Sequence, residues 1–167
     1  MRAVTLAAED DFEGWRDAAR ALAQAHVAPP EIVWRVGEGG GDLFEQLRLE
    51  LQSHAAAEEE SLYATMLANP ELREDARHSV SEHKEVDDLL GELMDIEMSS
   101  SAWLSKFRAM KDRYLHHIDE EEEEMFPAAA EELDNATEEE LATIYEERKP
   151  EELELAKANP PGGDERE

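Results

Sequence analysis

The 167-residue chain contains no cysteine, which excludes disulfides, zinc knuckles, iron–sulfur clusters and thiol nucleophiles. No apolar run approaches the roughly 20 residues of a membrane span. No apolar segment with a small-residue cleavage site follows Arg2, so we expect no signal peptide and a cytoplasmic location. Basic residues are also scarce, because 16 Lys and Arg stand against 44 Asp and Glu, a net charge of −28. This charge argues against nucleic acid or an anionic membrane as a partner.

What the chain does contain is apolar residues at helical spacing. The hydrophobic share of 41% is enough to build a core despite the charge. Four long segments with this periodicity are joined mostly by short turns, which predicts an all-α protein folded as an antiparallel four-helix bundle. The predicted helices cover residues 9–26, 42–67, 71–98 and 102–126.

Local signals predict where these helices begin and end. Asp42 is expected to cap the second helix, and Asn69-Pro70 to end it. The serines at 99–101 form a turn and a cap, and Pro127 is expected to kink or end the fourth helix. The pattern Thr137-x-x-Glu140 predicts a short helix through a capping box.

The two ends of the chain differ from its centre. Residues 1–7 are expected to form a short strand or an arm, and residues 32–36 are a β-like run before a glycine-rich joint. Pro150 is expected to begin a last helical piece, followed by a flexible tail from residue 159. We therefore divide the chain into a lead segment with the first helix (1–41), a bundle domain (42–150) and a C-terminal helical piece with its tail (151–167).

The apolar stripes of the long helices are interrupted by polar donors at their centres. The second helix carries His54 and Glu58 on its stripe, the third carries His83, and the fourth carries His117 and Glu121. A buried carboxylate without a partner costs several kcal/mol. A bound cation offsets that cost directly.

The five donors are also expected at one height in the bundle. His83 lies 15 residues before the end of its helix, and His117 lies 15 residues after the start of the next. His54 and Glu58 agree with His83 to within about one turn, at ~1.5 Å per residue. Imidazole with carboxylate suits iron, manganese or zinc, and two carboxylates from different helices can bridge two ions. The predicted metal ligands are His54, Glu58, His83, His117 and Glu121.

Several neighbours of these residues are expected to have no ligand role. His116 lies about 100° around the helix from His117 and is assigned to the flank. Of the acidic run 119–124, only Glu121 continues the stripe, and its neighbours form a solvated face. His78 is expected at the surface or the rim of the site. Residues expected in the core are Tyr63, Met66, Met94, Met110, Tyr114 and Met125.

Three segments resemble one known family, the hemerythrin-like (HHE cation-binding) domains. They are HAAAEEESLYATM at 54–66, SEHKEVDDLLGEL at 81–93 and HHIDEEEEEMFP at 116–127. The resemblance implies an antiparallel four-helix bundle with a pair of non-haem iron ions, held by the five donors above, with Glu58 and Glu121 as bridges. Members of the family bind oxygen reversibly, sense iron or oxygen, or take part in redox defence.

The lead segment departs from this resemblance. The family's first helix normally supplies a histidine, whereas residues 9–26 contain only His26, at the far end, so the first-helix ligand is either His26 or missing. Residues 5–37 are similar instead to the leading segment of certain uracil-DNA glycosylase-like proteins. The remaining chain has no room for that family's catalytic region, so we expect no such activity.

The sequence leaves three functions open. We favour a hemerythrin-like protein that holds non-haem iron, with manganese or zinc as alternatives, and that binds oxygen or senses oxygen or iron. The alternatives are an oxidoreductase that consumes peroxide or nitric oxide at the same site, and a metal-free interaction bundle. Ferritin-type di-iron bundles are disfavoured because the chain has no Glu-x-x-His. The sequence also lacks His-Glu-x-x-His, a glycine-rich phosphate loop and Gly-x-Ser-x-Gly.

Overall fold

The computed structural model describes residues 40–161, and this part of the chain contains helices and no strands. Two π-helical turns, η1 and η2, each join two α-helices, so that residues 40–68 and 101–132 form two continuous helices. The elements in order are α3 (Gly40–Glu58), η1 (Glu59–Tyr63), α4 (Ala64–Ala68), α5 (Arg73–Met94), α6 (Ser101–Glu120), η2 (Glu121–Met125), α7 (Phe126–Glu132) and α8 (Asn135–Ala158).

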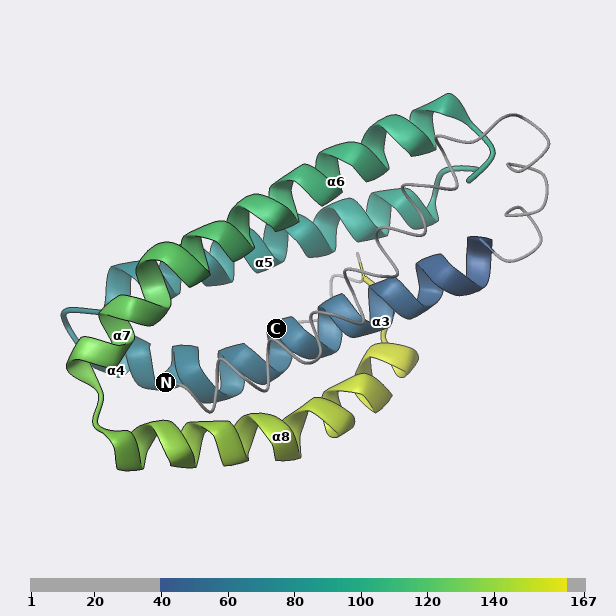
Figure 1. The fold of residues 1–167 in the computed structure, drawn as a ribbon. Helices are drawn as coiled ribbons and strands as arrows, with labels where there is room; N and C mark the ends of the chain where they lie inside the picture. Colours follow the sequence, from purple (N-terminus) through teal and green to yellow (C-terminus); the bar gives the residue numbers. More distant parts are fainter. Residues whose placement is uncertain (1–39, 162–167) are drawn as a thin grey trace.

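The long helices run alternately up and down. In Figure 1, α3 leads to α4 at one end of the molecule, α5 returns, α6 leads back to α7, and α8 returns again. α3 lies along α8, and α5 lies along α6. The all-α antiparallel four-helix bundle is therefore confirmed. The predictions for the strand at 1–7, the helix at 9–26, the run at 32–36 and His26 lie outside the described residues, as does the tail from residue 162.

Two of the predicted turns are confirmed. α4 ends at Ala68, and Asn69 has extended backbone (ψ 121°), as expected for a residue that precedes proline. Ser100 caps α6, because its side chain accepts a hydrogen bond from the Trp103 backbone N–H at 3.1 Å. α5 ends at Met94, four residues before the predicted end.

The predicted start of the second helix is wrong. Of the two outcomes expected at Pro127, a kink or an end of the fourth helix, the end is wrong. α3 begins at Gly40, so Asp42 lies inside the helix and does not cap it. Pro127 does not end its helix, which continues to Glu132. A proline has no N–H to donate, and its ring presses on the carbonyl four residues earlier. The π-helical turn η2 directly precedes Phe126 and Pro127, and its wider hydrogen-bonding pattern accommodates the proline.

α8 is one long helix, so the prediction of two short C-terminal pieces is also wrong. Its N-cap is Asp134, which accepts a hydrogen bond from the Thr137 backbone N–H at 2.8 Å, and Pro150 lies in its interior. Leu141, Tyr145 and Ala156 are all buried, so the inward face of α8 continues past the proline. Packing of this face along α3 outweighs the local break that a proline favours.

The core consists of two apolar clusters with a polar layer between them. Met94 was expected in the core but is 44% exposed. Leu93, which follows the buried Leu90 by three residues instead of four, is buried in its place. The first cluster contains Phe44, Leu47, Leu51, Val86, Leu90, Leu93, Trp103, Phe107, Met110, Tyr114 and Ile118. The second contains Leu62, Tyr63, Met66, Leu72, Ala76, Met125, Phe126, Ala129, Leu141 and Ala142.

None of the described helices combines the length and the apolar character needed to cross a membrane.

Candidate metal centre

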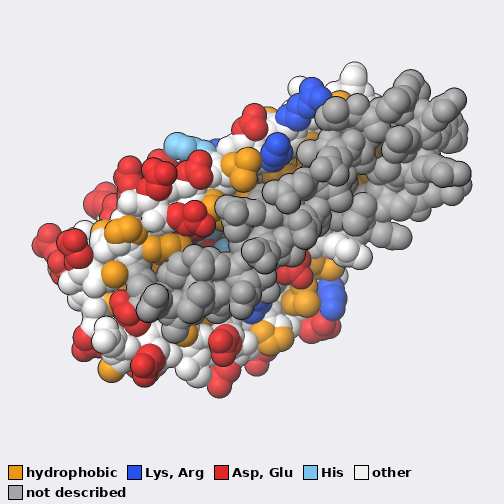
Figure 2. Space-filling model, in the orientation of Figure 1, with side chains coloured by type: hydrophobic (Ala, Val, Ile, Leu, Met, Phe, Trp, Pro, Cys, Tyr) orange, Lys and Arg blue, Asp and Glu red, His pale blue; other side chains and the backbone are white. Residues whose placement is uncertain are grey.

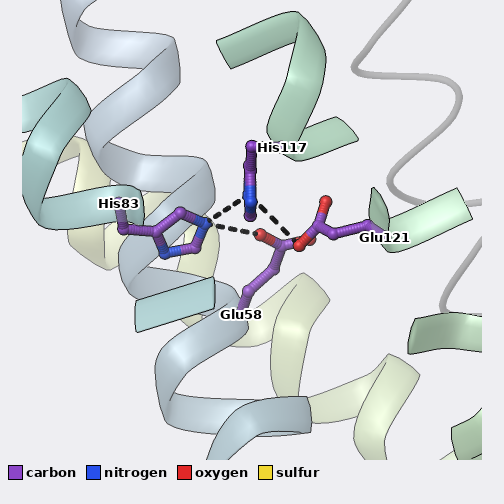
Figure 3. Close-up of side chains that lie close together, drawn as sticks. All are labelled: Glu58, His83, His117 and Glu121. Atoms are coloured by element: carbon purple, nitrogen blue, oxygen red, sulfur yellow. Dashed lines mark hydrogen bonds and ion pairs between the residues drawn. The ribbon is translucent and has the colours of Figure 1, made fainter. Parts of the chain in front are cut away.

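Four of the five predicted ligands meet in the polar layer between the two apolar clusters. Each of Glu58, His83, His117 and Glu121 offers a donor atom, and these atoms all lie within 4.8 Å of one another. Figure 3 shows the four side chains converging, with Glu58 from the end of α3, His83 from α5, and His117 and Glu121 from the continuous helix 101–132. All four are buried, and His117 is 0% exposed.

The distances among these donors suit a shared cation. The Nε2 atoms of His83 and His117 are 2.9 Å apart. His117 Nε2 is 3.3 Å from Glu121 Oε1, and His83 Nε2 is 3.6 Å from Glu58 Oε2. Two ligands about 2.1 Å from one ion in a tetrahedral arrangement lie about 3.4 Å from each other. The observed separations bracket this value.

His54, the fifth predicted ligand, lies at the edge of this group. It is buried, and its Nε2 is 3.3 Å from Glu58 Oε1 on the same helix. This Nε2 and Glu58 Oε2 are buried atoms without a hydrogen-bond partner among the described residues. Buried polar atoms normally find a partner. A cation held between the two side chains supplies one.

All three imidazoles turn Nε2 towards the centre and hold Nδ1 against an outer residue. The Nδ1 partners are the Tyr145 hydroxyl for His54 at 2.7 Å, Glu59 Oε1 for His83 at 3.1 Å, and Glu82 Oε2 for His117 at 2.9 Å. Metal-ligating histidines usually have such partners, which fix the ring orientation and the tautomer.

Glu82 determines the tautomer of His117. Burial acts to raise the pKa of Glu82, but the hydrogen bond and the charge of His117 outweigh it and lower that pKa to about 2. Glu82 is therefore an ionised acceptor, and His117 Nδ1–H donates to it. The other ring nitrogen of His117, Nε2, then faces the centre of the site. His83 also holds its Nδ1 against a carboxylate, and the two Nε2 atoms face each other at 2.9 Å, where one cation could accept both as ligands.

The two central carboxylates resist ionisation when no cation is bound. Burial, with the negative charges of Glu121 and Glu59, raises the pKa of Glu58 well above its ordinary value. Burial also raises the pKa of Glu121, although the charge of His117 and a hydrogen bond from the Tyr63 hydroxyl oppose that rise. A divalent cation would remove this penalty.

The π-helical turns bring Tyr63 to the site, which the sequence reasoning missed. η1 directly follows Glu58 and η2 begins at Glu121, so both His-x-x-x-Glu pairs lead into a π-helical turn. A π-helical turn contains one residue more than an α-helical turn, so two neighbouring residues, Leu62 and Tyr63, both face the core. Regular α-helical spacing would bury only Leu62. The sequence feature that could have predicted these turns is a pair of adjacent large apolar residues after each glutamate, Leu62-Tyr63 and Met125-Phe126.

Glu59, Glu82 and Tyr145 were also missed. Glu82 is 1% exposed and directly precedes His83. Glu82 lies three residues after Ser79 and four residues before Val86, both of them buried, and this helical spacing places Glu82 on the inward face. Tyr145 was missed because α8 was not predicted as a long helix. The assignments of His117 to the interior and His116 to the surface are confirmed, and in the run 119–124 only Glu121 is buried.

The comparisons agree with this arrangement. Residues 10–129 match the family model of the hemerythrin HHE cation binding domain, which is most of the chain. The chain belongs to the hemerythrin HHE cation-binding family. A solved structure of a hemerythrin HHE cation binding domain-containing protein from Mycobacterium kansasii has the same fold, with a TM-score of 0.71 and 24% sequence identity over 90% of this chain and 86% of that one. No curated protein matches the chain.

Membership of this family and the buried His/Glu cluster point to the same chemistry. The cluster supplies buried nitrogen and oxygen donors, and one of them, Glu58 Oε2, has no hydrogen-bond partner among the described residues. The residues present therefore fit a metal ion of the kind that imidazole and carboxylate bind. The HHE cation-binding domain that the sequence resemblance implied is confirmed.

Proposed function

We propose that this HHE domain holds a pair of non-haem iron ions in its polar layer and uses them to bind or sense dioxygen. The proposal is carried by one observation: three imidazoles turn Nε2 towards two buried carboxylates while outer residues hold each Nδ1. This donor set also suits manganese and zinc. Iron is preferred because of the family resemblance.

The position of each residue suggests its role as a ligand. His54, His83 and His117 would each hold one ion from one side. Glu58 and Glu121 lie between the histidines and could bridge two ions, since Glu58 offers Oε1 towards His54 and Oε2 towards His83. Their two negative charges would offset part of the charge of the ions.

When bound, reduced iron can bind dioxygen or give electrons to it. The protein's part is to control access and protons. The apolar clusters above and below the layer limit the access of water to the donors along the length of the bundle. Burial raises the pKa values of the Tyr63 and Tyr114 hydroxyls well above the ordinary value for tyrosine, so both hydroxyls stay protonated. This favours reversible binding over proton-consuming turnover.

A cavity favours the second candidate, an oxidoreductase that consumes peroxide or nitric oxide. It has a volume of about 580 Å³ and lies between α3 and α5, with His83 and Tyr114 on its wall. This space is much larger than a diatomic molecule needs. It would also give peroxide a route to the His83 side of the site.

One experiment separates these functions. The iron-loaded protein is reduced without oxygen, mixed with oxygen, and then returned to an oxygen-free atmosphere. We expect an absorption spectrum that appears with oxygen and reverses on its removal. Irreversible oxidation, with consumption of added peroxide, would support the oxidoreductase. Failure to retain any metal would support the metal-free interaction bundle.

A further inference from the structure

A second group of metal-binding side chains lies on the outer side of Glu82. His78, Glu82 and Glu120 each offer a donor atom, and the three atoms lie within 4.8 Å of one another. His78 Nε2 is 3.4 Å from Glu82 Oε1 and 3.2 Å from Glu120 Oε2. These separations are close to the roughly 3.4 Å between two ligands of one tetrahedral ion.

Glu82 faces both groups of donors. Its Oε2 accepts the hydrogen bond from His117 in the buried centre, and its Oε1 points towards His78. Although Glu82 is 1% exposed, this Oε1 has no hydrogen-bond partner within the part of the chain that the structure describes. Arg113 Nη1 lies 2.9 Å away as an ion pair but without hydrogen-bond alignment. A buried carboxylate oxygen is thus aimed at the outer group with an incomplete set of partners.

Arg113 does not close this position. Its Nε also contacts Glu85 Oε2 at 2.5 Å, so the guanidinium keeps a partner if a cation displaces it from Glu82. The pair with Glu85 lies on the exposed side of α5, away from the buried centre. A cation at Glu82 Oε1 would therefore leave no arginine unpaired.

The outer group is open to solvent and lies in a strongly negative field. The His78 side chain is 59% exposed, and His116 Nε2 adds a further donor 3.3 Å from Glu120 Oε1. Figure 2 shows a histidine among acidic side chains at the upper edge of the molecule, over α6. The net charge of −28 raises the local concentration of cations at such a surface.

We propose that His78, Glu82 and Glu120 form a second, solvent-accessible site for a divalent first-row transition-metal cation, distinct from the buried centre. Imidazole with carboxylate selects such a cation over Mg²⁺ or Ca²⁺, which prefer oxygen ligands. None of the three residues of this outer site is a donor of the buried cluster, and Glu82 contacts that cluster through its hydrogen bond with His117. The outer site therefore stands whatever ion the buried centre holds.

The test is a Zn²⁺ titration of the full chain by calorimetry and equilibrium dialysis, on the wild type and on His78→Ala and Glu120→Gln. Glu124→Gln is the matched control, because it removes an exposed carboxylate from the same acidic run. We expect the wild type and the control to bind one more ion than the two variants, or to bind it about a hundredfold more tightly. Arg113→Gln should tighten the same step, since it removes the competing cation.

A parallel titration of His83→Ala distinguishes the two sites. The outer ion should remain when the buried centre is lost. If His83→Ala retains all its metal while His78→Ala loses one ion, the outer site stands and the proposed buried centre fails. If His78→Ala and Glu120→Gln bind Zn²⁺ as the wild type does, the outer group is a set of surface ion pairs and the proposal is overturned. Loss of the buried metal in these variants, with no separate outer step, would overturn it equally.

Discussion

Glu82 and His117 form a buried hydrogen bond of 2.9 Å between Oε2 and Nδ1, with both side chains at most 1% exposed. The ionised Glu82 accepts a hydrogen bond from Nδ1–H of His117, and the ring then turns its Nε2 atom towards His83 and Glu121. This carboxylate is not itself among the inner donors. We therefore expect Glu82 to influence metal binding through the orientation and basicity of one imidazole.

Glu82→Gln should weaken metal binding at the buried centre about 10- to 100-fold, because the neutral amide no longer holds His117 in the same tautomer or raises its basicity. The shape of the side chain is preserved, so the helical circular dichroism should not change. Competition of the loaded protein with a chelator measures the affinity. Glu85→Gln, an exposed glutamate that also pairs with Arg113, is the control. Equal affinities for the two variants would show that Glu82 has no positioning role.

Glu58→Gln should stabilise the metal-free protein and prevent metal from stabilising it. The pKa of Glu58 is raised by burial and by Glu121 and Glu59, so its contribution to stability is favourable when it is protonated and is lost as pH rises through that pKa. The amide of Gln cannot ionise, so it avoids this loss, and the free energy of unfolding of the metal-free protein should rise by about 1 kcal/mol or more at neutral pH. The gain should vanish near pH 4.5, where the wild-type carboxyl is already protonated.

Thermal unfolding with and without metal, at several pH values, measures both effects of Glu58→Gln. With metal in hundredfold excess over the dissociation constant, the wild type should gain about 2.7 kcal/mol, or roughly 5–10 °C. The variant should gain little. A variant that is less stable than the wild type in the absence of metal would contradict the view that these carboxylates are held for a cation.

Tyr145→Phe should lower metal affinity through His54. The lost hydroxyl no longer holds His54 Nδ1, so the ring is free to turn its Nε2 away from Glu58. His54→Ala should act in the same direction and more strongly. His116→Ala, an exposed histidine, should leave the affinity of the buried centre unchanged. Wild-type affinity in both His54→Ala and Tyr145→Phe would place His54 outside the metal centre.

Ser100→Ala separates stability from metal binding. Loss of this N-cap should destabilise the protein by about 1 kcal/mol. Ser100 caps the N-terminal end of α6, whereas His117 lies in its last turn. The number of metal ions bound per chain should therefore not change. A loss of metal in this variant would show that binding follows overall stability and not the donor cluster.

Much of the site followed from spacing alone. His54, Glu58, His83, His117 and Glu121 each interrupt an apolar stripe, and helix length set their common height. The apolar stripes did not predict the π-helical turns η1 and η2. The first of them contains Tyr63, whose hydroxyl donates a hydrogen bond to Glu121. Glu82 was hidden because a charged residue beside His83 is usually solvated.

The C-terminal half of the fold was less predictable. Proline inside a helix removes a hydrogen bond and normally breaks it, so Pro127 and Pro150 both favoured a break. At Pro127 the preceding π-helical turn η2 offsets the loss, and at Pro150 the packing of α8 along α3 does so. Local sequence signals do not show how the helices pack against each other. Because α8 was not predicted as one long helix, the role of Tyr145 was not predicted either.

The most direct test of the metal centre is the metal content of the full chain, purified without chelator, compared with that of His83→Ala and His117→Ala. We expect about two iron ions per wild-type chain in the buried centre. Both variants should lose that iron while remaining helical. A wild-type chain that contains no metal and binds none on addition, or variants that retain the wild-type content, would contradict it.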